Sequence, residues 1–186
     1  MSNINNKVLA LLMSLLFTFT YLLNFFNKIA ECSLVFVFLA LTANIITELH
    51  TKKSAIISLI VSIVVSFGLL WNFDYYIHGR IIPMMTGASF LSLLVSIYCS
   101  TSVLQYLKPT YSFNLRNFIG LVVGAIIDGS IMIGFLINQF SSSRVIAIFW
   151  AEVSFKCLYS LVIYGLLFFG SYVINSEKRS NNSIGN

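Results

Sequence analysis

Long apolar stretches alternate with short polar breaks along the whole chain. A helix needs about 20 mostly apolar residues to cross the hydrocarbon core of a bilayer, and six stretches approach or exceed that length. Buried strands are excluded because they are much shorter than these stretches. The pattern predicts one all-α membrane domain with spans near residues 8–26, 32–50, 54–71, 81–107, 118–137 and 145–174.

Composition narrows the class of protein further. The chain is 58% hydrophobic and 9% charged, with a mean hydropathy of +0.91, whereas about a quarter of the residues of a soluble domain are charged. The predicted spans leave no loop long enough for a separate soluble catalytic module. The net charge of +5 would suggest nucleic acid in a soluble protein, but here the cations fall in short loops beside apolar stretches, so no nucleic-acid partner is expected.

The distribution of those cations predicts an orientation. An even number of spans places both termini on one side, and the loops on that side carry most of the Lys and Arg residues. Cytoplasmic loops are enriched in Lys and Arg, so both termini are predicted to be cytoplasmic. The predicted cytoplasmic cations are Lys7, Lys52, Lys53, Lys108, Arg116, Lys178 and Arg179, against Lys28, Arg80 and Arg144 on the other side.

Small residues at helical spacing predict the packing faces. Serine recurs every three or four residues in the third and fourth spans, and the fifth span carries Gly120 and Gly124 at the same spacing, followed by Asp128. Small residues let membrane helices approach closely, so Asp128 is expected to point into the bundle with the glycines. The serines are Ser54, Ser58, Ser62, Ser66, Ser89, Ser92, Ser96 and Ser100.

The sixth span carries a polar stripe. Glu152, Lys156, Ser160 and Tyr164 follow one another at i, i+4 steps along one side of an apolar helix. Ionised groups inside a membrane are costly, so such residues face partners, ions or substrates. Two interpretations stay open: an internal ion pair between Glu152 and Lys156 that touches no ligand, or a pair whose lysine also contacts substrate.

The end of the second span adds a further candidate pair. Asn44 and Glu48 lie four residues apart on one face, although Glu48 could instead extend to the membrane surface. No phosphate-binding loop, metal-ligand spacing or Ser/His/Asp set accompanies these residues, so neither an enzyme nor a cofactor is expected.

Three segments together resemble a known family. They are the run from Asn44 to Lys53, Arg116-Asn117 ahead of Asp128, and Lys156 with Tyr164. This set is similar to that of the queuosine-precursor transporter family, also called the VUT family, of small bacterial membrane proteins.

The resemblance implies a fold similar to the vitamin-binding subunits of energy-coupling-factor transporters. It also implies uptake of a 7-deazaguanine base such as preQ0, preQ1 or queuine across the bacterial inner membrane for transfer RNA modification. The acids Glu48 and Asp128 would accept hydrogen bonds from the base, Asn44 would read its edge, and Lys156 would donate to its carbonyl or hold Glu152. The alternative is a binding subunit for another vitamin-like molecule that works with a separate ATP-driven module. Assembly as a homo-oligomer stays open.

Overall fold

The structure, a computed structural model, describes residues 2–26, 28–70, 76–77, 80–81 and 85–184, with side chains described for 6–26, 28–70 and 85–173. Within these ranges the chain forms six helices and one short hairpin. The elements are α1 (Ser2–Phe25), α2 (Ile29–Leu49), α3 (Lys52–Leu70), β1 (Tyr76–Ile77), β2 (Arg80–Ile81), α4 (Met85–Tyr106), α5 (Phe113–Leu136) and α6 (Ser142–Ile184).

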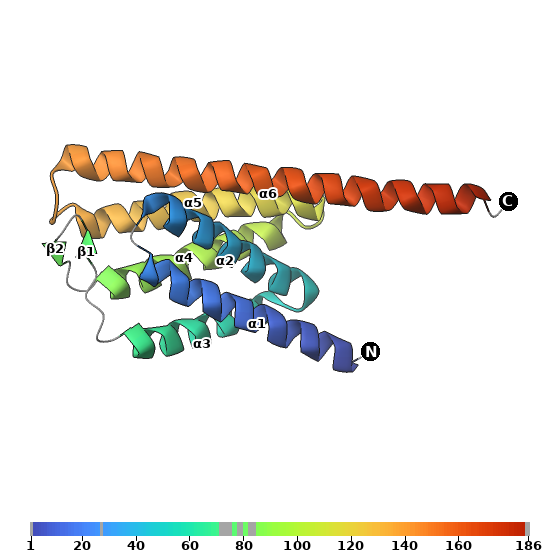
Figure 1. Ribbon diagram of the computed structural model, residues 1–186, viewed down its shortest axis with the longest axis horizontal. Coiled ribbons are helices and arrows are strands. Elements are labelled where there is room, and N and C mark those ends of the chain that lie inside the picture. The colour runs from blue at the N-terminus through green and yellow to red at the C-terminus, as the bar shows by residue number, and fades with distance from the viewer. Residues whose placement is uncertain (1, 27, 71–75, 78–79, 82–84, 185–186) are drawn as a thin grey trace.

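All six described helices are long and apolar enough to cross a membrane. This confirms the prediction of an all-α multi-pass membrane protein. The apolar part of α6 ends at Val173, and the helix then continues past the bundle (Figure 1).

The start of the fourth span was predicted wrongly. Ile81, its expected first residue, lies in β2 and pairs with Tyr76 of β1, while α4 begins at Met85. Hydropathy alone does not separate a short apolar strand from the first turn of a helix, so the apolar run was assigned to the span. The expected end of the third span at Trp71 lies outside the described residues.

The helices lie side by side, with the two ends of the chain at one end of the bundle and the β1–β2 hairpin at the other (Figure 1). A chain that crosses a membrane six times has both termini on the same side. We call the two ends the terminal end and the hairpin end. Which of them faces the cytoplasm stays a prediction from the cation distribution.

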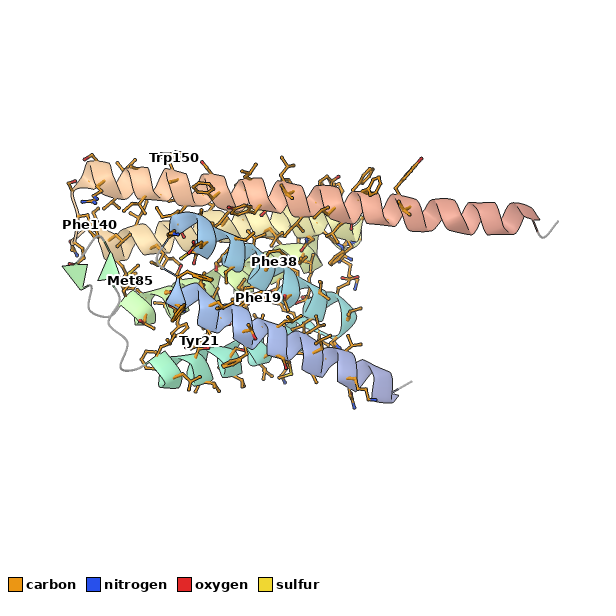
Figure 2. The ribbon with its side chains drawn as sticks, viewed as in Figure 1. Phe19, Tyr21, Phe38, Met85, Phe140 and Trp150 are labelled. Atoms are coloured by element: carbon orange, nitrogen blue, oxygen red, sulfur yellow. The ribbon has the colours of Figure 1, made fainter. Side chains whose placement is uncertain are left out.

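Helix α2 lies at the centre of the fold and contacts every other described helix. Phe36, Leu39, Ala40 and Ala43 on α2 are fully buried, whereas the outward side chains of α6, such as Trp150, are exposed (Figure 2). Lipid chains are as apolar as leucine, so an apolar outer surface suits a bilayer. An internal site would therefore be formed by buried side chains between the helices, such as those of α2.

Helices α4 and α5 approach closely through the predicted small residues. A Cβ atom added at Gly120 would lie 3.0 Å from the Ser100 backbone oxygen, and one at Gly124 would lie 3.3 Å from the Ser100 Cβ. The close approach turns Asp128, one further i+4 step along α5, into the bundle, where it is buried. The predicted packing face of α5 is confirmed.

Candidate functional site: charges inside the helix bundle

Three ionisable side chains meet inside the bundle, and we call them the charged triad. Lys156 of α6 donates hydrogen bonds to Asp128 of α5 and to Glu152 one turn away on α6. The lysine side chain is 1% exposed, so its ammonium group has left solvent completely. The predicted Glu152–Lys156 pair is confirmed, and Asp128 is an additional partner that helical spacing did not indicate.

Two further helices complete the surroundings of the triad. The Ser92 hydroxyl of α4 donates to Asp128 Oδ1 at 2.5 Å, and the Lys156 Nζ lies 4.2 Å from the ring centroid of Phe36 on α2. The aromatic face adds a favourable electrostatic contact to a cation that has lost its hydration. The sequence predicted Ser92 only as a packing residue. Its spacing to Ser96 within α4 carries no information about Asp128 on the neighbouring helix.

A glycine that the sequence analysis did not single out brings α6 against the triad. A Cβ added at Gly129 would lie 3.0 Å from the Phe149 ring and 3.1 Å from Val153. Because Gly129 follows Asp128 directly, the close contact between α5 and α6 fixes the acid opposite Lys156. A lone glycine outside a repeat gives no packing signal in sequence.

The triad is not electrically balanced. Two carboxylates face one ammonium, and among the described ion pairs Lys156 is the one cation that reaches either acid. When all three groups are ionised, the site therefore carries one excess negative charge. Ionic groups in a membrane interior are stabilised by partners, so this site favours a cation or a group rich in N–H donors.

A second polar cluster lies toward the terminal end, and we call it the Arg116 cluster. It comprises side chains of α2, α4 and α5 together with one lysine of the connecting loop. Arg116 Nη2 donates to Glu48 Oε1 at 2.7 Å, while Lys108 Nζ lies 3.6 Å from the same oxygen. The members are Asn44, Glu48, Ser100, Lys108, Arg116 and Asn117.

Asn44 holds the inner part of this cluster together. Its Nδ2 donates to Asn117 Oδ1 at 2.9 Å and to the Ser100 hydroxyl at 3.3 Å. All three side chains are fully buried, so these bonds replace water that the amides have lost. Helices α2, α4 and α5 are thereby joined at one level of the bundle.

The two predicted acids, Glu48 and Asp128, thus belong to different clusters. Arg116 and Asp128 are twelve residues apart on α5, about 18 Å along the helix axis at 1.5 Å per residue. The contact of Gly120 and Gly124 with α4 fills the interval. In this conformation the two clusters are too far apart for one small molecule to contact both, and the joint site expected from the sequence is not assembled.

Tyr164 belongs to neither cluster. It lies eight residues beyond Lys156 on α6, and its ring packs against Phe118 of α5 with a centroid separation of 5.4 Å. Ser160, between them, donates to the backbone oxygen of Lys156. Of the predicted stripe on α6, only Glu152 and Lys156 therefore join Asp128, and a ligand role for Tyr164 stays a prediction.

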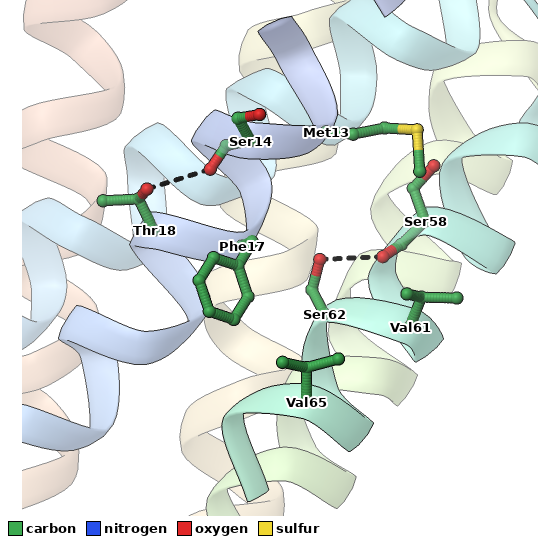
Figure 3. A pocket seen from close by; sticks show the side chains of 8 residues that line it. All are labelled: Met13, Ser14, Phe17, Thr18, Ser58, Val61, Ser62 and Val65. Atoms are coloured by element: carbon green, nitrogen blue, oxygen red, sulfur yellow. Dashed lines mark hydrogen bonds between the residues drawn. The ribbon is translucent and has the colours of Figure 1, made fainter. Parts of the chain in front are cut away.

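A groove of about 360 Å³ opens between α1 and α3, away from both clusters (Figure 3). Three of the hydroxyl groups that line it donate to backbone oxygens of their own helices: Ser14 to Ala10, Thr18 to Ser14, and Ser62 to Ser58. None of the described side chains that line it is charged. The rest of its lining is mainly apolar, which suits a polar solute less well than either cluster does.

Comparison of the chain with protein-family models, with curated proteins and with solved structures finds no match. The resemblance to the queuosine-precursor transporter family therefore stays a prediction from individual residues. The architecture and the two clusters rest on the structure itself.

Proposed function

We propose that this protein is a membrane transporter that imports a queuosine precursor, a 7-deazaguanine base, for transfer RNA modification. The observation that carries the proposal is the charged triad, in which two acids face one lysine between membrane-spanning helices. Ionisable residues in such positions mark substrate and ion pathways.

A purely structural role accounts less well for the triad. Replacing a buried ion pair by apolar residues of similar size is often neutral or stabilising, so packing alone does not require Asp128, Glu152 and Lys156. A membrane enzyme would need a nucleophile or a metal set beside the acids. The described residues around the triad supply a serine bonded to Asp128 and an aromatic ring, which suit binding better than bond cleavage.

The chemistry of a deazaguanine complements the triad. Its ring N–H and amino groups donate hydrogen bonds, and its carbonyl oxygen accepts them. Asp128 and Glu152 would accept hydrogen bonds from the donors of the base, and the Lys156 ammonium group would donate one to its carbonyl oxygen. A precursor that also carries a cationic amine, such as preQ1, would neutralise the excess charge.

The Phe36 ring gives the site a flat apolar face. It is fully buried on α2 and already contacts the Lys156 ammonium group. Binding sites for small planar molecules combine such apolar walls with a few convergent polar groups. In this proposal Asn44 and Glu48 act on the base at a different stage, nearer the terminal end of the bundle.

The test is restoration of queuosine in transfer RNA. The gene is expressed in a bacterium that lacks its own synthesis of the deazaguanine base and its own precursor uptake but keeps the later steps that turn preQ0, preQ1 or queuine into queuosine in transfer RNA. The cells are supplied with each precursor at low concentration. Recovery of queuosine with at least one precursor is expected, as transport is then the only missing step. If none restores queuosine although the protein is present in the membrane, the proposal fails.

A further inference from the structure

We infer that the Arg116 cluster is a second ligand site, and that it binds a small oxyanion, a carboxylate or a phosphate group. This inference does not depend on the transport of a base at the charged triad. It rests on the donors, the charge and the helix end that meet at the cluster.

The cluster holds buried donors without acceptors. Arg116 is 5% exposed, and although its Nη2 is paired with Glu48, its Nε and Nη1 have no hydrogen-bond partner among the described residues. Asn117 is fully buried, and its Nδ2 is likewise unpaired. Buried polar groups are nearly always satisfied in native proteins, so three unpaired nitrogen atoms in adjacent residues indicate a ligand that accepts hydrogen bonds.

The net charge of the Arg116 cluster indicates which kind of hydrogen-bond acceptor it would bind. Two cations, Arg116 and Lys108, face the single carboxylate of Glu48, which leaves one excess positive charge. A neutral carbonyl would satisfy a donor and leave that charge uncompensated, whereas an oxyanion does both. Arginine is well suited to this role because its planar guanidinium group matches carboxylate and phosphate oxygens.

The position on α5 adds a third contribution. Arg116 and Asn117 lie in the first turns of a 24-residue helix that begins at Phe113, so they stand at the positive end of its dipole. Anions are bound at helix starts by this dipole and by nearby donors. Here the dipole acts together with a buried guanidinium group, and the Phe113 ring covers that group at 5.5 Å from its centroid.

Two sources can supply the same chemistry: a soluble anion, or the phosphate of an anionic lipid. The cluster reaches the protein surface at Lys108, whose side chain is 58% exposed. The expected readout is saturable binding of inorganic phosphate or acetate, or of phosphatidylglycerol.

The experiment uses the full chain purified into nanodiscs of phosphatidylcholine, which carries no net charge. Phosphate and acetate are titrated by calorimetry, and the thermal unfolding midpoint is followed in parallel. Asn117→Asp is the test variant: it keeps the size and the oxygen that accepts from Asn44, but it removes the unpaired donor and adds a negative charge. We expect anion affinity to fall at least tenfold.

Lys53→Gln is the matched control. Lys53 is an exposed cation at the same end of the bundle, and the substitution lowers the net charge by one, as Asn117→Asp does. Its anion affinity should equal that of the wild type. An equal loss in both variants would mean attraction to the overall charge and would overturn the site.

If Asn117→Asp does not yield a monodisperse protein, Arg116→Lys replaces it. This variant keeps the charge and a donor for Glu48 while removing the guanidinium nitrogens, and it too should bind at least tenfold more weakly. Unchanged binding by whichever variant folds would overturn the inference.

Nanodiscs that contain phosphatidylglycerol distinguish the two sources. Competition between this lipid and phosphate identifies a headgroup site, and undiminished phosphate binding identifies a site for a soluble anion. Absence of saturable binding of phosphate, acetate and phosphatidylglycerol to the wild type contradicts the inference. Deazaguanine uptake enters none of these readouts, so the transport proposal stands or falls separately.

Discussion

The charged triad and the Arg116 cluster place ionised groups in the same bundle in opposite ways. In the triad one buried lysine serves two acids, which leaves an excess negative charge. In the Arg116 cluster one acid serves two cations, and buried donors remain unpaired. Our two proposals follow from that difference: a donor-rich or cationic ligand at the triad, and an acceptor-rich ligand nearer the terminal end.

The two clusters also differ in their relation to the membrane surface. The Arg116 cluster ends in an exposed lysine, whereas no exposed cation takes part in the ion pairs described at the triad. Between them the glycines of α5 lie against the serines of α4. A solute that passes from one cluster to the other along this face must therefore separate the two helices.

The largest expected effect is that of Lys156→Met. Removing the ammonium leaves Asp128 and Glu152 buried without a cation, and breaking a buried pair costs about 3–5 kcal/mol. We expect low abundance in the membrane and no uptake, measured by quantitative immunoblotting and by a labelled precursor. Near-normal abundance would show that the triad contributes little to stability.

A triple variant separates stability from binding at the same place. Changing Glu152→Gln and Lys156→Met alone leaves Asp128 unpaired, so Asp128→Asn must be added to remove every charge of the triad. Abundance should recover toward the wild-type level because no unpaired charge remains buried. Uptake should stay absent because neutral amides bind a cationic or donor-rich ligand more weakly than carboxylates do. Uptake at the wild-type rate would remove the triad from the proposed function.

Gly120→Val tests the contact that separates the clusters. The new side chain would meet the Ser100 backbone oxygen, which cannot move aside as a flexible side chain can, and overpacking of this kind costs about 1–3 kcal/mol. Gly134→Val is the control, because a Cβ there meets no atom within 4 Å. The thermal midpoint should fall clearly for the first variant and little for the second; equal changes would contradict close packing as the cause.

The smallest effect is expected for Glu48→Gln. The glutamine oxygen still accepts from Arg116, and the Glu48 side chain is 28% exposed, so the stability loss should be about 1 kcal/mol or less. Uptake should fall without disappearing. A loss as large as that of Lys156→Met would mean that the two clusters do not differ in the way described.

Local periodicity accounts for what could be predicted from the sequence. The six spans follow from apolar length, the inward direction of Asp128 from its spacing to Gly124, and the Glu152–Lys156 pair from one turn of α6. Each of these depends on residues within a single helix.

Most of the missed features join different helices. The bonds from Lys156 to Asp128 and from Arg116 to Glu48 depend on the axial position of α5 relative to α6 and α2. The spacing of residues within one helix does not determine that position. The separation of Glu48 from Asp128 has the same origin. The strand at Ile81 was missed for another reason, since an apolar run suits either structure.

The central claim is that the excess negative charge of the triad binds the transported molecule, and Asp128→Asn tests it most directly. The variant leaves Glu152 balanced by Lys156 and keeps an oxygen for Ser92, so normal insertion is expected. Uptake of labelled 7-deazaguanine precursor into proteoliposomes should then be lost although the protein is folded. Uptake at the wild-type rate by the folded variant would contradict the account.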